Sequence, residues 1–183
     1  MASSEQAAGP ALKELLKDGA VAGEWIVDPS RSAVSFKSGS MWGLVRVHGV
    51  FRQVTGNGTV SPTGEVSGAL TVSAASVDTK NAKRDTHLRS ADFFDSDKHP
   101  DIAYTVQGIR PSGQGVTVTG TLSIRDRTRP LTFDGSATVH GDGEVWLDAT
   151  MDINRGDFGL TWNLMGSMSM NSTITVHAVF TNR

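Results

Sequence analysis

Residues 116–124, Val-Thr-Val-Thr-Gly-Thr-Leu-Ser-Ile, alternate without interruption between apolar or glycine positions and hydroxyl side chains. Successive side chains of a β-strand point to opposite faces, so this order places Val116, Val118, Leu122 and Ile124 on one side and the threonines on the other. A helix would mix the two kinds on every face. The stretch therefore predicts a strand with one apolar face.

The same period of two recurs along most of the chain from Trp25 onward. Glycine, asparagine and aspartate turns separate the alternating segments, as at Gly141-Asp142-Gly143. About eight strands with one helical interruption describe an all-β antiparallel meander, which can close into a barrel or pack as a sandwich. The predicted inward positions are Val34, Phe36, Val45, Val47, Phe51, Leu70, Val72, Ala74, Leu131, Phe133, Val139, Val145, Leu147, Met151, Ile153, Ile174, Val176 and Phe180.

These inward faces carry almost no ionisable groups, so any ligand held between them should be apolar. They also include small residues, which either leave volume unfilled for a ligand or fit the taper of a filled barrel. The small positions are Gly49, Gly120, Gly135, Ala137, Ala149 and Ala178.

Residues 77–102 interrupt the strands with a segment longer than a hairpin needs. Asn81 can cap a short helix over residues 82–89, since its side-chain oxygen can accept a backbone amide of the first turn. Asp85 and Arg89 stand four apart with the acid first, which favours a helical ion pair, and with Arg84 they are expected to form an ion-pair network against the barrel. The segment is predicted to cover something.

Within this segment, residues 84–102 (RDTHLRSADFFDSDKHPDI) closely resemble the signature of the YceI-like family of lipid-binding proteins. Three further matches follow the family's order: residues 25–28 with 32–36 resemble its opening strands, residues 118–125 with 128–130 its central hairpin, and residues 153–159 its late Arg-x-Asp-Phe-Gly loop. The resemblance covers roughly residues 24–180.

The resemblance implies an eight-stranded antiparallel lipocalin-like barrel around a long apolar channel. We therefore expect a barrel domain over residues 24–183 with the short helical insertion, preceded at 1–23 by a lead that is a short helix or partly disordered. It implies binding, sequestration or transport of a polyisoprenoid or similar long-chain lipid, of the isoprenoid quinone or prenyl pyrophosphate class, with no cofactor. The expected ligand-binding residues are Phe36, Trp42, Val47, Phe51, Leu70, Arg84, His87, Leu88, Arg89, Phe93, Phe94, Leu122, Phe133, Phe158 and Trp162.

Length and composition set the outer limits. The chain has 183 residues and a net charge of −2, which gives no electrostatic case for nucleic acid or an anionic membrane. It has no cysteine, which excludes thiolate chemistry. No apolar run reaches the roughly 18 residues of a transmembrane helix, so stable membrane insertion is not expected. Residues 1–23 lack the apolar core of a signal peptide, which predicts a cytoplasmic protein, although many relatives are exported. Leu12, Leu15 and Leu16 form an apolar stripe that Gly19 ends, typical of a helix docked on the body, a lid or a membrane-touching anchor.

Several polar clusters leave alternatives open. His87, Asp92, Asp95, His99 and Asp101 lack the spacing of a metal site, so no metal is predicted. Arg125, Arg127 and Arg129 could clamp a head group or lie on a solvated hairpin tip, where Asp126 replaces the family's usual glycine.

The apolar residues of 39–43 and 159–171 suit a channel mouth or ordinary core packing. An enzyme acting on a lipophilic substrate is the alternative function if His87 or His99 lines the cavity beside an acid. A third reading is a stress-related interaction module with no physiological ligand. The sequence leaves open whether the protein forms a homodimer.

Overall fold

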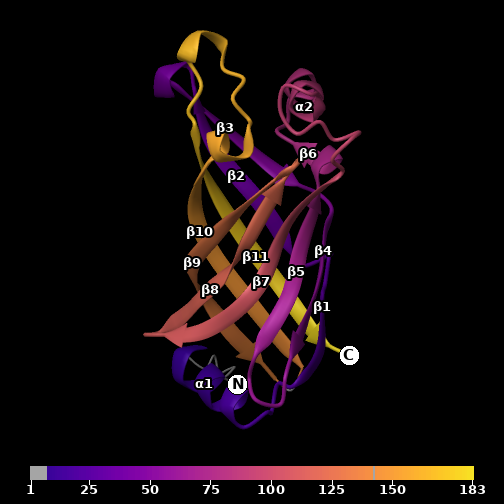
Figure 1. The fold of residues 1–183 in the computed structure, drawn as a ribbon, viewed down its shortest axis with the longest axis vertical. Helices are drawn as coiled ribbons and strands as arrows, with labels where there is room; N and C mark the ends of the chain where they lie inside the picture. The colour runs from indigo at the N-terminus through magenta and orange to yellow at the C-terminus, as the bar shows by residue number, and fades with distance from the viewer. Residues whose placement is uncertain (1–7, 142) are drawn as a thin grey trace, which may run out of the picture.

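Eleven strands form one antiparallel sheet in the computed structural model, which describes residues 8–141 and 143–183. The strands alternate in direction around a long, upright barrel (Figure 1). Their bounds are β1 Gly23–Val27, β2 Ala33–Ser40, β3 Val45–Phe51, β4 Val54–Val60, β5 Val66–Ser73, β6 Val77–Asp78, β7 Asp101–Ser112, β8 Gly115–Ile124, β9 Arg127–His140, β10 Glu144–Asn154 and β11 Asn171–Asn182.

Eight of these strands close into a ring in the order β1-β4-β5-β7-β8-β9-β10-β11, because β1 also pairs with β11. The closing contact pairs Trp25 with Asn182 and Val27 with Phe180. Closure satisfies the backbone groups that an open sheet would leave at its edges. The predicted eight-stranded antiparallel barrel is therefore confirmed.

The remaining three strands, β2, β3 and β6, branch from the other half of β11. Residues Ser172–His177 of β11 pair with β2, while the segment that follows them pairs with β1. The first two strands of the chain, β1 and β2, thus pair with successive parts of β11 and not with each other. This branch raises the barrel wall at the end opposite the C-terminus (Figure 1).

Strand β4 was not predicted from the sequence, because Gly56 and Gly58 interrupt its apolar pattern. A Cβ atom at Gly56 would lie 2.8 Å from Cγ2 of Val27 and 2.7 Å from the Ala69 carbonyl oxygen. The glycine lets β4 approach its two neighbours, and it removes the side chain that alternation would have revealed.

A helix lies at each end of the barrel (Figure 1). Helix α1 (Ala8–Lys17) packs across the lower end, where Leu12 and Leu16 are buried and the chain leaves the helix through Gly19 at φ 69°. Helix α2 (Ala82–Arg89) begins at Asn81, whose side chain accepts the Arg84 amide as predicted. Within the described residues, four short 3-10 helices complete the fold, at Met41–Gly43 (η1), Ala74–Ser76 (η2), Arg155–Phe158 (η3) and Leu164–Gly166 (η4). None of the described helices has the length and apolarity to cross a bilayer.

The small inward residues mostly do not create the empty space suggested by the sequence. A Cβ atom at Gly49 would lie 2.5 Å from Cε1 of Phe36, and one at Gly120 would lie 2.8 Å from the Tyr104 hydroxyl oxygen. Aromatic rings of neighbouring strands therefore occupy the room that these glycines leave. Of the small residues named above, Ala137 alone contacts the cavity described next.

Candidate functional site

An internal cavity of about 800 Å³ follows the barrel from α1 to α2. Leu12 and Leu16 of α1, with Trp25, line its lower end. At the upper end its lining includes Met41 and Leu164, which are 53% and 61% exposed, so the cavity reaches the surface there. Its size falls in the usual range for a pocket that holds a small molecule.

The walls are built from the strand faces that alternation predicts to point inward. Most of the large inward positions predicted from β2, β3, β5, β9, β10 and β11 line the cavity, whereas Val139 does not. Those that line it are Val34, Phe36, Val45, Val47, Phe51, Leu70, Val72, Leu131, Phe133, Val145, Leu147, Met151, Ile153, Ile174, Val176 and Phe180. Deep in the channel, the Tyr104 hydroxyl donates to the Leu131 carbonyl oxygen at 2.8 Å, and burial raises the pKa of Tyr104 to about 12. The neutral, already bonded phenol adds no charge to these walls.

Charge enters the lining only near the upper end and is of one sign. Among the described residues, Lys83, Arg84 and Arg155 line the cavity with His87, and no aspartate or glutamate does. The protein as a whole carries a net charge of −2. The excess of cations at the mouth is therefore local.

His87 is held in an aromatic cluster at this mouth. Its ring meets Phe93 and Trp162 edge-to-face at 5.1 Å and 4.4 Å between centroids. Nε2 of His87 lies 2.8 Å from Oδ2 of Asp92, which belongs to the turn after α2. The hydrogen bond to the carboxylate fixes the ring's orientation toward the cavity.

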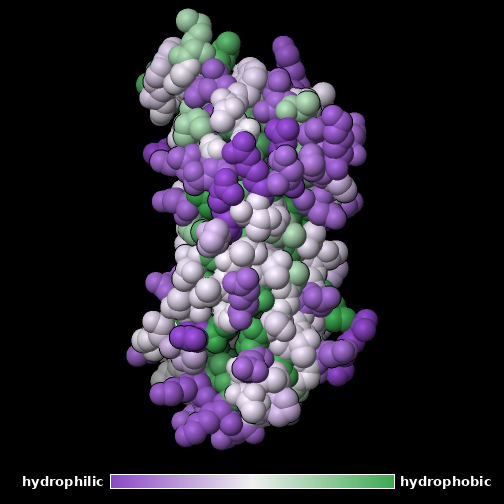
Figure 2. Space-filling model, in the orientation of Figure 1, coloured by the Kyte–Doolittle hydropathy of each residue, from purple (hydrophilic) through white to green (hydrophobic). Residues whose placement is uncertain are grey.

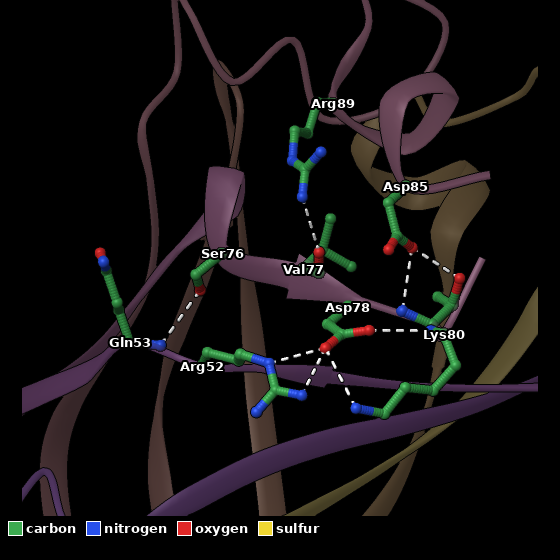
Figure 3. A network of polar contacts seen from close by, with 9 residues as sticks. Arg52, Gln53, Ser76, Val77, Asp78, Lys80, Asp85 and Arg89 are labelled. Carbon is green, nitrogen blue, oxygen red and sulfur yellow. Dashed lines mark hydrogen bonds and ion pairs between the residues drawn. The ribbon is translucent and has the colours of Figure 1, made fainter. Parts of the chain in front are cut away.

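Helix α2 is anchored by hydrogen bonds to the backbone rather than by the predicted ion-pair network. Oδ1 of buried Asp85 accepts from the Thr79 amide and hydroxyl at 2.9 Å and 2.6 Å. The Arg84 guanidinium donates to Oγ1 and the carbonyl oxygen of Thr79. Arg89 donates to the Ala75 carbonyl oxygen and to that of Val77, the second of which Figure 3 shows. Among the described residues no ion pair joins Arg84, Asp85 and Arg89, so the predicted ion-pair network is wrong. The three side chains do fix the α2 segment, but through hydrogen bonds to Thr79, Ala75 and Val77.

Arg155 is a site residue that the sequence did not reveal. It is 6% exposed, lines the cavity and carries its guanidinium carbon 5.8 Å from the centroid of Phe93. Its Nε and Nη1 donate to the carbonyl oxygens of Ser169, Leu160 and Trp162, whereas Nη2 is buried with no partner in the described residues. Burial lowers the pKa of Arg155 from its ordinary value. A guanidinium nonetheless stays protonated, so a cation lies at the mouth.

The predicted ligand-binding residues divide into two groups. Three do not line the cavity: Trp42 is 71% exposed, Arg89 turns toward the backbone of β6, and Phe158 is buried in the packing around η3. The others do line it, namely Phe36, Val47, Phe51, Leu70, Arg84, His87, Leu88, Phe93, Phe94, Leu122, Phe133 and Trp162.

The arginine hairpin does not face the cavity. Arg125, at φ 57°, takes the left-handed position expected for Asp126, and its Nη1 donates to the Phe93 carbonyl oxygen at 3.2 Å. The Arg127 guanidinium packs against the turn at Gly159: a Cβ atom added to Gly159 would lie 3.3 Å from the guanidinium carbon of Arg127. These side chains support the segments around the mouth.

A closed antiparallel barrel around one long apolar cavity defines a class of small β-barrel proteins with an internal ligand-sized space. The model of one family, the YceI-like domain, matches residues 25–180, and the chain belongs to that family. Its relatives include Protein YceI of Escherichia coli O17:K52:H18, 28% identical over 171 residues that cover 87% of this chain and 88% of the relative. A UPF0312 protein of Pseudomonas putida strain W619 is 31% identical over 143 residues, 73% of each chain.

Solved structures show the same fold at lower sequence identity. BcnA of Burkholderia cenocepacia superposes with a TM-score of 0.75 at 23% identity, covering 84% of this chain and 98% of its own. A polyisoprenoid binding domain of Saccharophagus degradans, implicated in plant cell wall breakdown, gives a TM-score of 0.69 at 16% identity, with 87% and 98% covered.

Proposed function

We propose that this protein binds one long-chain amphiphile, a polyisoprenoid or a similar lipid, with its tail in the barrel and its head group at the α2 end. The observation that carries the proposal is the cavity itself, apolar along its walls and charged only at its mouth. The polyisoprenoid binding of the Saccharophagus degradans domain supports the same ligand class. The role is carriage or sequestration, since the tail would be withdrawn from water.

The mouth favours a head group that accepts hydrogen bonds or carries negative charge. Lys83, Arg84 and Arg155 are cations there without a carboxylate among the described lining residues. A phosphate or pyrophosphate would meet charge-assisted donors, which bind more strongly than neutral ones. A quinone could accept the same hydrogen bonds without the charge.

A specific observation also favours an enzyme as the second candidate. His87 lines the cavity and is bonded to Asp92, and a carboxylate partner of this kind can orient a histidine that acts as a general base. The ring is otherwise enclosed by Phe93 and Trp162, which offer no nucleophile. A substrate or water would have to supply the reacting group, whereas head-group binding needs only the ring nitrogen.

The first experiment is organic extraction and mass spectrometry of the natively purified protein, beside native mass measurement of the complex. One stoichiometric long-chain species would support the carrier. Added prenyl pyrophosphate and isoprenoid quinone are then compared by competition. A protein that purifies empty and rejects both lipids would contradict the proposal.

The variants Arg84→Ala and His87→Ala separate the carrier from the enzyme. We expect both variants still to bind the lipid tail. Their affinity for the phosphorylated ligand should fall roughly tenfold, because one charge-assisted hydrogen bond is lost. The extracted lipid is incubated with each protein and followed for product. Turnover by the parent protein that disappears in His87→Ala would favour the enzyme instead.

A further inference from the structure

Two loops project beyond the barrel at the open end of the cavity and expose large apolar side chains. They are the β2–β3 loop with η1 and the loop around η4, and they lie side by side at the upper left of Figure 1. The Trp42 amide donates to the Ser167 carbonyl oxygen at 2.9 Å, and the Ser169 amide to that of Gly39 at 2.9 Å. We call their exposed side chains the apolar tip: Met41, Trp42, Leu44, Val45, Leu164 and Met165.

The exposure is large and concentrated. Leu44 is 83% and Met165 84% exposed, and the described chain has no other large hydrophobic residues as exposed as those of the tip. Figure 2 shows green and pale green residues at the upper left, above a purple, hydrophilic band. Contiguous apolar side chains rimmed by polar ones mark a surface that binds something.

The tip is continuous with the cavity. Met41, Val45 and Leu164 belong both to the exposed tip and to the cavity lining. An apolar tail could therefore move between the barrel and an apolar phase covering the tip without crossing water.

The groove at the base of the tip is cationic. Lys37 and Arg46 line it with Trp42, and no acidic residue lies among its described lining residues. Together with Lys83 and Arg84 in the lining of the adjacent mouth, they supply cations that an anionic surface would complement.

These features fit a lipid bilayer better than a second copy of the chain. In a two-fold dimer the same patch meets itself, so Lys37 and Arg46 would face their own copies across the contact. A stable protein interface also buries about 800 Å² on each partner, usually across a broad complementary face. Two narrow projecting loops resemble a wedge, which suits insertion among head groups.

We propose that the apolar tip docks reversibly on an anionic phospholipid bilayer and aligns the cavity mouth with the membrane, so that the cargo enters and leaves there. The inference rests on the proposed lipid-carrying function and adds the surface through which exchange occurs. Leu44 and Met165 would enter the interface, while Lys37 and Arg46 would face lipid phosphates.

Vesicle cosedimentation tests the docking. The full protein is mixed with vesicles of phosphatidylcholine alone or with equal phosphatidylglycerol, both free of cargo lipid. We expect binding to the anionic vesicles and at least a tenfold loss in the Leu44→Asp/Met165→Asp double variant. The Lys37→Ser/Arg46→Ser double variant should bind the anionic vesicles roughly tenfold more weakly than the parent protein, with no change on phosphatidylcholine alone.

The matched control is Ser112→Asp/Gln114→Asp, which adds the same charge to the exposed β7–β8 hairpin at the other end and should bind like the parent protein. Equal binding by the tip variant and this control, or no binding of the parent to either vesicle, would overturn the proposal. So would a native mass showing a dimer that the tip variant dissolves, because a second copy would then cover the tip.

Cargo binding is measured separately, by adding prenyl pyrophosphate to each protein without vesicles. The tip variant should bind it as the parent does and extract it from vesicles at least tenfold more slowly. Failure of cargo binding in every protein, with vesicle docking intact, would refute the carrier function and not the docking. Unchanged extraction by the tip variant would refute the exchange role of the tip.

Discussion

Asp78 shows how a single carboxylate ties the barrel branch together. It accepts from Nε of Arg52 at 2.6 Å and from the Lys80 amide at 2.8 Å (Figure 3). The Lys80 amide first, and then Arg52, lower the pKa of Asp78 from 3.8 to about 2. A carboxyl with a lowered folded pKa stabilises the protein above its unfolded pKa, and that stabilisation is lost as the pH falls through the folded value.

We therefore predict that Asp78→Asn lowers the melting temperature at neutral pH and that its difference from the parent protein shrinks as the pH falls from 3.8 to about 2. Thermal unfolding followed by circular dichroism across that range measures both proteins. Asp126→Asn, at a hairpin tip where the described residues show no ion pair, serves as the control. A difference for Asp78→Asn that is constant with pH would contradict the linkage.

Residue roles were predictable where they depend on near neighbours in the chain. The Asn81 cap follows from one side chain and an amide three residues on. Arg155 escaped prediction because its acceptors lie in an irregular loop, as far along the chain as Ser169. The left-handed conformation of Arg125 was not predicted, because aspartate generally tolerates that region better than arginine and Asp126 was expected to adopt it. The pairing of Ile124 with Arg127 leaves Arg125 and Asp126 as the turn, and it is Arg125 that has the positive φ.

At the scale of elements, α1 is the cover of the lower cavity end. It is too short to persist alone in water, so its folding depends on docking. Leu16 is 8% exposed and lines the cavity. We predict that Leu16→Ala lowers the free energy of unfolding by about 2–5 kcal/mol. Urea unfolding measures it, with Lys13→Ala on the exposed face of the same helix as control; equal stability of the two variants would show that α1 contributes no packing.

Elements followed from the sequence where alternation was clean. The large inward residues of β10 (Val145, Leu147, Met151 and Ile153) line the cavity as predicted, as do Leu131 and Phe133 of β9. Strand β4 did not follow, because close approach to Val27 demands a glycine where the pattern needs an apolar side chain. The cause is packing between strands distant in sequence, which local pattern does not report.

At the scale of the whole molecule, periodicity alone left barrel and sandwich open, and the family resemblance decided between them. Closure rests on Trp25 opposite Asn182, two residues at opposite ends of the chain. The branch of β2, β3 and β6 along β11 has no local signature either. This branch forms the wall of the open end (Figure 1). Because its pairing could not be read from the sequence, the apolar residues of 39–43 and 159–171 were assigned to a channel mouth or to core packing, without a choice between the two.

The length of the cavity sets the last prediction. A tail that enters at the mouth and runs toward α1 buries more apolar surface with each added methylene, worth about 0.8 kcal/mol. Affinity for a graded series of saturated alkyl phosphates should therefore rise roughly tenfold for every two methylenes. It should level off once the tail reaches Leu12 and Leu16, which line the lower end. Competition against a fluorescent lipid measures the series, with matching alkyl alcohols as the control for the head group. Affinities that do not change with tail length would mean that the tail stays outside the barrel.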